Sequence, residues 1–191
     1  MVFDKKGNSI CIDPGGKFEK IGEILEKNKL HLKAVLITHP HFDHVLGVPE
    51  IKKDVSLYVP EEDINLYNSA REFTKNLLGF DPGEFRKPDY LLKGDEELEI
   101  GNIKIKVHYV PGHTQGHLMY EIDKNLFCGD LIFAGSIGRT DFPESSWQKM
   151  KDSLLYVIRN FSDDYEIYPG HGPKTNLGNE KRENPFLIEL L

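Results

Sequence analysis

The sequence has few cysteines, no long apolar run and no excess of basic charge. Only Cys11 and Cys128 occur among 191 residues, too few for a disulfide framework, so a reducing compartment such as the cytoplasm fits. No stretch approaches the roughly 18 consecutive apolar residues of a membrane span, and the start, MVFDKKGNSI, lacks an apolar signal-peptide core. With 24 Lys and Arg against 31 Asp and Glu, the net charge is −7. These absences argue against a membrane and a nucleic-acid partner.

Apolar residues are nevertheless sufficient for a core. Hydrophobic residues make up 39% of the chain and charged residues 29%, and the length predicts one domain over residues 1–191. Helix-like and strand-like patterns are mixed along the chain, with both parallel-type crossovers and hairpins. We therefore predict an α/β fold with layered packing around a mixed sheet or two sheets.

Periodicity and turn residues predict individual elements. A hairpin is expected over 2–12, then helices and buried strands over 18–25, 34–37, 45–53, 55–59 and 61–78, followed by a loop over 80–93. Strands follow at 98–100, 103–107, 118–122 and 126–128. Ser145 and Gln148 predict a capping box for a helix whose apolar face includes Trp147. His31 and His108 are expected at the surface, and both cysteines as small buried side chains.

A cluster of metal-ligand side chains follows the strand predicted over 34–37. His39, His41 and His44 lie within six positions, and Asp43 lies among them. Imidazole nitrogens and carboxylate oxygens bind zinc and related ions, and a His-X-His pair on extended backbone projects both rings to one side. The alternative is a solvated polar loop. The spacing favours a metal site.

Three later segments each place one further ligand-type side chain after a strand-like run. They are PGHT at 111–114, FCGD at 127–130 and PGHG at 169–172, and they contribute His113, Asp130 and His171. Strands that end at one edge of a sheet bring such residues together. Seven ligands are too many for one tetrahedral zinc, whereas two ions that share a carboxylate would use them all.

These motifs resemble those of the metallo-β-lactamase fold hydrolases, and within them the glyoxalase II (hydroxyacylglutathione hydrolase) group. The resemblance spans nearly the whole chain and rests on IDPGG at 12–16, THPHFDH at 38–44, PGHTQGH at 111–117, FCGD at 127–130, GSIGRTDFP at 135–143 and YPGHGPKT at 168–175. It implies an αββα sandwich of two mixed sheets between helical layers, with the site at one sheet edge. It further implies that His39, His41 and His113 hold the first metal, that Asp43, His44 and His171 hold the second, and that Asp130 bridges them.

Other residues of these motifs have two interpretations each. Asp13 and His117 would orient ligands by hydrogen bonds, or they are only structural. Arg139 could hold a substrate carboxylate, or it could fix its loop through an ion pair with Asp141, and Lys174 is a similar candidate.

The resemblance implies a cofactor and a reaction. Two divalent metal ions are expected, zinc foremost, although iron and manganese suit the same ligands. A hydroxide bridging them would attack a thioester such as S-lactoylglutathione. GSIGRTDFP and the ending Asn184-Pro185-Phe186-Leu187 resemble the short bacterial and archaeal form, which has no C-terminal glutathione-binding domain.

Other functions use similar residues. A persulfide dioxygenase would bind one iron through His39, His113 and Asp130, and lactone or ester hydrolases and RNA-processing enzymes share the ligand pattern. A non-enzymatic binding module is a third class. It is disfavoured because no ligand position has been lost.

The N-terminal strand is expected to lie at a sheet edge, because relatives have one more strand ahead of residues 2–12. Unpaired strand edges invite association. We therefore expect this edge either to pair with another chain, as a homodimer, or to be short and charged near Lys5 and Lys6.

Overall fold

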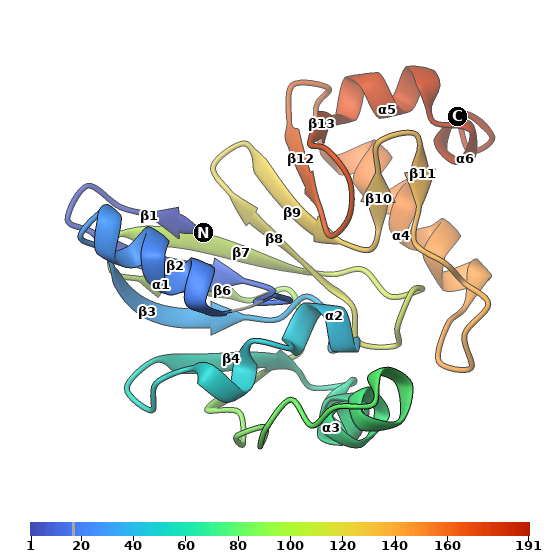
Figure 1. Cartoon of the computed structure of the whole chain (residues 1–191). Coiled ribbons are helices and arrows are strands. Elements are labelled where there is room, and N and C mark those ends of the chain that lie inside the picture. Colours follow the sequence, from blue (N-terminus) through green and yellow to red (C-terminus); the bar gives the residue numbers. More distant parts are fainter. Residues whose placement is uncertain (17) are drawn as a thin grey trace. The chain divides into compact units, whose positions relative to one another are not determined.

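The computed structural model describes residues 1–16 and 18–191 and contains two compact units (Figure 1). The first unit comprises Met1–Leu92 with Leu98–Lys104, and the second comprises Lys93–Glu97 with Ile105–Leu191. Whether they act as the single domain predicted from length stays a prediction. Among the described residues, no helix is both long and apolar enough to cross a membrane.

The first unit is a mostly parallel sheet with helices. Its elements are β1 (Val2–Phe3), β2 (Asn8–Ile12), α1 (Phe18–Lys27), β3 (His31–Leu36), α2 (Phe42–Val45), the 3-10 turn η1 (Val48–Glu50), β4 (Ser56–Pro60), α3 (Ile64–Leu78) and β5 (Tyr90–Leu92). The strand order is β1-β2-β3-β4-β5, in which β1 is antiparallel to β2 and the other pairs are parallel. The predicted N-terminal hairpin is confirmed.

The central strand of this sheet is buried on both faces, as its uninterrupted apolar run predicts. Ala34, Val35 and Leu36 of β3 are each at most 1% exposed. Val35 pairs with Cys11 on one side and Leu57 on the other, and all three belong to a core that includes Tyr67 of α3. This packing holds the ends of β2 and β3, and the polar segments that follow them, in fixed positions.

The second unit has a mixed sheet and the C-terminal helices. Its longer segment begins within β7 (Ile103–Tyr109), which follows β6 (Glu97–Ile100) in the chain. The unit's other elements are β8 (Leu118–Ile122), β9 (Asn125–Gly129), β10 (Ile132–Phe133), β11 (Ser136–Ile137), α4 (Trp147–Asn160), β12 (Glu166–Pro169), β13 (Thr175–Asn176), α5 (Leu177–Glu183) and α6 (Pro185–Ile188). Its strands have the order β13-β12-β9-β8-β7, with β12 and β9 parallel, and β10 and β11 form a separate hairpin. Met150, Leu154 and Val157 of α4 are fully buried in its core. The α/β class with mixed sheets is confirmed.

The helix predicted over 45–53 is wrong. Helical structure starts earlier, in α2, and resumes only as the short turn η1. Gly47 donates its N–H to the carbonyl of Pro14 at 2.6 Å, and Pro49 has no N–H to donate. A regular helix therefore cannot continue through these residues, and α2 instead contains Asp43 and His44.

Three further predictions, about one segment, one helix cap and one side chain, need correction. The segment expected as a loop over 80–93 contains β5, which pairs with β4. Ser146, and not Ser145, caps α4, because its side chain accepts the N–H of Lys149 at 3.3 Å. Trp147 is 44% exposed, because the first turn of α4 extends past the core.

His108 is also not a surface residue. Its Nδ1 lies 2.9 Å from the Tyr156 hydroxyl and its Nε2 lies 2.9 Å from the Glu121 carboxylate, and its side chain is only 12% exposed. His31 is exposed, as predicted, and both cysteines are buried free thiols.

Candidate metal centre

Asp13 follows β2 and organises the polar segment that follows β3. Its Oδ1 accepts the backbone N–H of Thr38 at 2.7 Å, and its Oδ2 accepts the Thr38 hydroxyl at 2.6 Å. Oδ2 also lies 2.9 Å from Nδ1 of His44. Asp13 has a positive φ of 49°, a conformation that aspartate tolerates better than most residues. The carboxylate thus joins the ends of two neighbouring strands.

These hydrogen bonds determine which ring nitrogens carry protons. A carboxylate only accepts, so His44 Nδ1 donates to Asp13, and the lone pair of the neutral ring lies on Nε2. The single hydroxyl proton of Thr38 goes to Asp13, so Thr38 Oγ1 accepts from His39 Nδ1, 3.1 Å away. The lone pair of His39 therefore also lies on Nε2. One aspartate orients two of the predicted ligands, one directly and one through Thr38.

The four ligand-type residues of the first unit lie close together. Ligand atoms of His39 and His41 are within 4.8 Å of each other, and so are those of His39 and His44 and those of Asp43 and His44. The His39 and His44 rings are 4.1 Å apart between centroids. His39 and His44 are buried, whereas His41 and Asp43 are partly exposed. The segment therefore forms a compact group of donors, two of them buried and two partly exposed.

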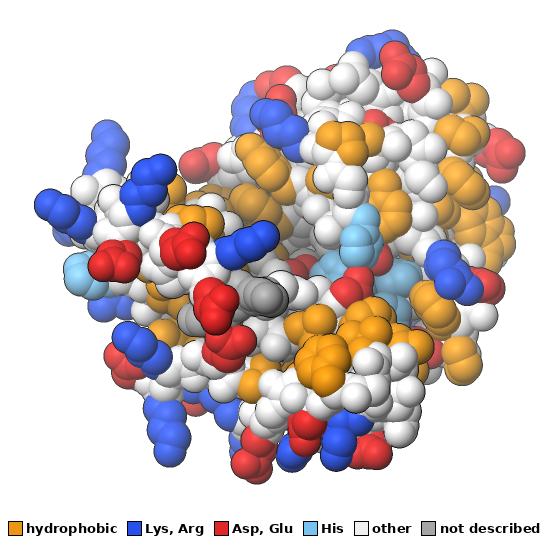
Figure 2. Space-filling view, in the orientation of Figure 1, with side chains coloured by type: hydrophobic (Ala, Val, Ile, Leu, Met, Phe, Trp, Pro, Cys, Tyr) orange, Lys and Arg blue, Asp and Glu red, His pale blue; other side chains and the backbone are white. Residues whose placement is uncertain are grey.

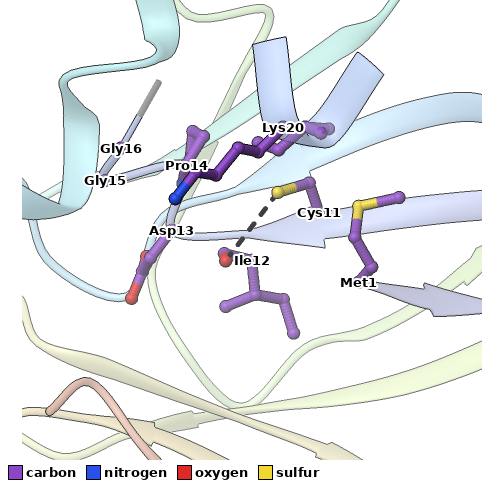
Figure 3. Close-up of a pocket in the computed structure, with 9 residues that line it drawn as sticks. Met1, Cys11, Ile12, Asp13, Pro14, Gly15, Gly16 and Lys20 are labelled. Atoms are coloured by element: carbon purple, nitrogen blue, oxygen red, sulfur yellow. Dashed lines mark hydrogen bonds between the residues drawn. The ribbon is translucent and has the colours of Figure 1, made fainter. Parts of the chain in front are cut away.

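A cavity of about 500 Å³ is lined by the end of β2, the residues that follow it and α1 (Figure 3). Its lining includes Cys11, Asp13, Gly15 and Lys20. Figure 3 shows the Asp13 carboxylate pointing away from Lys20. The carboxylate is thus directed to Thr38 and His44, and not to Lys20 in the cavity lining.

In the second unit, Asp130 lies between two histidines. Its Oδ2 is 3.5 Å from Nε2 of His113 and 3.6 Å from Nε2 of His171. His113 Nδ1 donates to the carbonyl of Arg139 at 2.8 Å, so the lone pair of its neutral ring lies on Nε2, the atom nearer to Asp130. His171 is half exposed, whereas the other two residues are buried. The three residues present one carboxylate and two imidazoles together.

His117 contacts Asp130 through the backbone. Its Nε2 accepts the N–H of Asp130 at 3.1 Å, so the proton of the neutral ring is on Nδ1. The ring is fully buried. His117 therefore orients the strand end that carries Asp130, and its Nε2 is not available to bind a metal.

The two predicted substrate contacts both form ion pairs, Arg139 within its own loop and Lys174 with the first residue of β12. Arg139 donates two hydrogen bonds to Asp141, each 2.8 Å long, and its guanidinium lies 4.3 Å from the centre of the Phe142 ring. Lys174 pairs with Glu166 at 3.0 Å. The Arg139–Asp141 pair raises the pKa of Arg139 and lowers that of Asp141. All four side chains are at least 40% exposed, so a substrate anion could compete with these weak surface pairs.

An apolar surface adjoins α2 in the first unit (Figure 2). The Phe42 ring, between His41 and Asp43 in the sequence, lies 6.1 Å from the ring of Phe73 in α3. Phe73 and Leu77 are each more than half exposed. An uncharged group would therefore find apolar contacts beside the first unit's donors.

The donors in both units suit a divalent metal. Three imidazoles present their lone pairs on Nε2 while a protein oxygen holds Nδ1–H, the arrangement that is usual for histidine ligands. Thiol chemistry is disfavoured, since burial raises the pKa of Cys11 to about 11 and raises that of Cys128 as well. The residues therefore fit zinc, iron or manganese, which accept nitrogen and oxygen ligands.

Known proteins share this organisation. The family model of the metallo-beta-lactamase superfamily matches residues 1–171. Hydroxyacylglutathione hydrolase GloC of Haemophilus influenzae is 33% identical, over 98% of this chain and 91% of that protein. Solved structures with the same fold include BLEG-1 B3 metallo-beta-lactamase, with 31% identity, a TM-score of 0.89 and coverage of 97% and 91% of the two chains. A di-iron-bound form of TTHA1623 has 34% identity, a TM-score of 0.84 and coverage of 92% and 88%. The chain therefore belongs to the metallo-β-lactamase superfamily of metal-binding hydrolases and has glyoxalase II-type relatives.

Proposed function

We propose that this protein is a dinuclear metallohydrolase that cleaves a thioester such as S-lactoylglutathione or a related hydroxyacyl thioester. The observation that carries the proposal is the orientation of the histidines, since His39, His44 and His113 all present Nε2 lone pairs. Those of His44 and His113 lie beside the carboxylates of Asp43 and Asp130. The hydroxyacylglutathione hydrolase among the relatives supports the choice of a thioester. Free cysteines support the cytoplasm as the place of the reaction.

In this proposal each ligand has one role. His39, His41 and His113 would hold one ion, Asp43, His44 and His171 would hold the other, and Asp130 would be shared by the two. Divalent ions held in this way supply hydroxide near neutral pH and polarise an acyl carbonyl. We propose zinc as the metal, with iron or manganese as alternatives.

Residues around the ligands keep them in position. Asp13 and Thr38 hold the rings of His44 and His39, and His117 holds the backbone of Asp130. Arg139 and Lys174 stay predictions as substrate contacts. A carboxylate of the substrate would replace Asp141 or Glu166 in pairs that solvent already weakens.

Metal content is the first test of the proposal. We expect about two equivalents of zinc, iron or a mixture in protein purified without added metal or chelator, measured by elemental analysis. The loaded protein is then tested with S-lactoylglutathione, other thioesters, a lactone and a β-lactam. One iron per chain, together with oxygen consumption when glutathione persulfide is added, would indicate a persulfide dioxygenase and not a hydrolase. A folded chain without metal would support a binding module.

Asp130→Asn tests the bridge. The substitution keeps the shape of the side chain but removes the charge that two cations would share. We expect turnover to fall about 100-fold or more, since even outer contacts of metal ligands contribute about 10- to 100-fold. Asp164→Asn, at an exposed aspartate paired with Lys124, is the control and should keep full activity. Unchanged hydrolysis by Asp130→Asn in protein with native near-UV circular dichroism would refute the bridge.

A further inference from the structure

A buried carboxylate outside the ligand set joins three segments of the second unit. Glu180 of α5 is only 3% exposed. Its Oε2 accepts the backbone N–H of Gly135 at 2.8 Å and the amide of Asn184 at 2.9 Å, and its Oε1 accepts the hydroxyl of Thr175 at 2.7 Å. A buried carboxylate is costly unless such donors satisfy it. The three hydrogen bonds therefore offset the cost of burying Glu180.

Asn184 extends this contact to both strands of the β10–β11 hairpin. The residue is fully buried, and its side-chain amide also donates to the carbonyl of Ser136 at 2.9 Å and, more weakly, to that of Phe133 at 3.4 Å. Its Oδ1 accepts the N–H of Phe186 at 3.1 Å. Glu180 and Asn184, which we call the α5 clamp, thus fasten the hairpin to the C-terminal helices (Figure 1).

The clamped segments are those next to the metal-ligand residues. The hairpin begins two residues after Asp130, and Thr175 follows His171 by four residues. The Phe133 ring of the hairpin stands edge-on to the His171 ring, with 5.9 Å between their centroids. A shift of the hairpin would therefore also displace Asp130 and His171.

A third ligand position is connected through Gly138, just after the hairpin. A Cβ atom at Gly138 would lie 1.9 Å from the carbonyl oxygen of Asp130 and 3.2 Å from Nδ1 of His113. The backbone at this position thus lies directly against both residues. The next residue, Arg139, supplies the carbonyl that orients the His113 ring.

We propose that Glu180 is a positioning residue of the metal centre, which acts through the hairpin and Thr175 to hold Asp130, His113 and His171 in the arrangement that binds metal. The proposal rests on the proposed function, because it presumes that these three residues bind metal. Both oxygens of Glu180 accept hydrogen bonds from Gly135, Thr175 and Asn184, so we assign it a positioning role and not that of a ligand.

Two substitutions at Glu180 separate a positioning role from mere burial. Glu180→Leu has a similar size but removes the acceptor of the Gly135 N–H and of the Thr175 hydroxyl, and one of the acceptors of the Asn184 amide. Glu180→Gln keeps one oxygen, which can face Gly135 and Asn184, while its amide donates to the Thr175 hydroxyl, which can accept. Glu121→Leu is the matched control, because Glu121 is a mostly buried carboxylate of the same unit that accepts from Tyr165 and contacts His108, away from the hairpin.

Metal affinity is measured by titrating chelator-treated protein with Zn²⁺. We expect Glu180→Leu to bind Zn²⁺ at least about tenfold more weakly, whereas Glu180→Gln stays within about threefold of the wild type. Glu121→Leu should lose stability in denaturant but keep its Zn²⁺ affinity. Thr175→Val removes one of the hydrogen bonds to Glu180 from a partly exposed strand, and it should also weaken Zn²⁺ binding. This variant replaces Glu180→Leu in the test if Glu180→Leu does not fold.

Hydrogen exchange gives a readout without metal. In the metal-free protein, amides of residues 132–137 should exchange faster in Glu180→Leu than in the wild type or in Glu121→Leu. Wild-type Zn²⁺ affinity in folded Glu180→Leu, or an equal loss in Glu121→Leu, would overturn the positioning role. If the wild type binds no metal at all, the proposed function fails. Hydrogen exchange of residues 132–137 then still shows whether the α5 clamp stabilises the hairpin.

Discussion

Asp13 is the single residue on which the orientation of two predicted ligands depends. Its two oxygens accept from Thr38 N, Thr38 Oγ1 and His44 Nδ1. In Asp13→Asn, an amide nitrogen at the Oδ2 position would face His44 Nδ1 as a donor. The His44 proton would then move to Nε2, the atom that we propose binds metal. If the amide nitrogen instead takes the Oδ1 position, it faces the Thr38 N–H, and two buried donors then lie opposite each other.

We therefore expect Asp13→Asn to weaken Zn²⁺ binding about 10- to 100-fold and to lower the free energy of unfolding by about 1–2 kcal/mol. Zn²⁺ titration and denaturant unfolding measure the two effects. Asp4→Asn is the control, since Asp4 accepts several hydrogen bonds in the β1–β2 turn, where the Asn8 side chain and backbone N–H groups lower its pKa to about 2. That variant should keep its Zn²⁺ affinity. Equal affinities in the two variants would contradict the role of Asp13.

At the scale of elements, the loop after β2 and helix α2 pack backbone against backbone. A Cβ atom at Gly15 would lie 1.6 Å from the carbonyl oxygen of Asp43, whereas one at Gly16 would have no neighbour within 4 Å. Gly47, after α2, donates to the carbonyl of Pro14. The close approach explains why glycine is required beside a helix that carries two ligand-type residues.

Gly15→Ala should therefore displace α2, while Gly16→Ala should not. We expect the first variant to lose about 1–3 kcal/mol in free energy of unfolding, the usual range for overpacking, and to bind Zn²⁺ more weakly. The second should change stability by less than about 1 kcal/mol. Denaturant unfolding and Zn²⁺ titration compare them. Two variants with the same stability and affinity would show that the loop can move away without consequence.

Most elements follow from local pattern, and the exceptions have identifiable causes. The strand over 34–37 and the helix ending at Leu78 are found because continuous apolar runs and amphipathic periods are properties of neighbouring residues. The helix predicted over 45–53 fails because Gly47 and Pro49 interrupt the backbone ladder. The short strand β5 has a weak pattern of its own and forms through pairing with β4.

At the scale of the whole molecule, the N-terminal edge bears on self-association. The edge strand β1 has two residues, and the turn after it contains the exposed Lys5 and Lys6. Phe3 is 57% exposed. The edge is thus short and flanked by charge, one of the two predicted outcomes, while pairing with a second chain stays a proposal.

We expect a homodimer, if it forms through this edge, to be weak and to dissociate on dilution. Light scattering should then show a mass that rises with concentration from one chain toward two, and Phe3→Glu should keep the protein at the mass of one chain. Phe186→Glu, at an exposed residue of α6 in the second unit, is the control. A constant mass of one chain across all concentrations would rule out pairing.

The sequence by itself determined the types of residues at the proposed site and most of the strands and helices. Ligand chemistry resides in side-chain identity, and spacings such as HxHxDH are local, so His39, His41, Asp43 and His44 could be found without a structure. Superfamily membership followed from the same short motifs.

Only the tertiary structure decided which nitrogen each ring presents and what holds the ligands. The proton on Nδ1 of His44 depends on Asp13, which lies 31 positions away, and the hairpin after Asp130 depends on Glu180, which lies 50 positions away. The same reason explains His108, whose burial comes from Glu121 and Tyr156 on other elements. Hydrogen-bond partners and burial are properties of packed neighbours in space, and local pattern does not contain them.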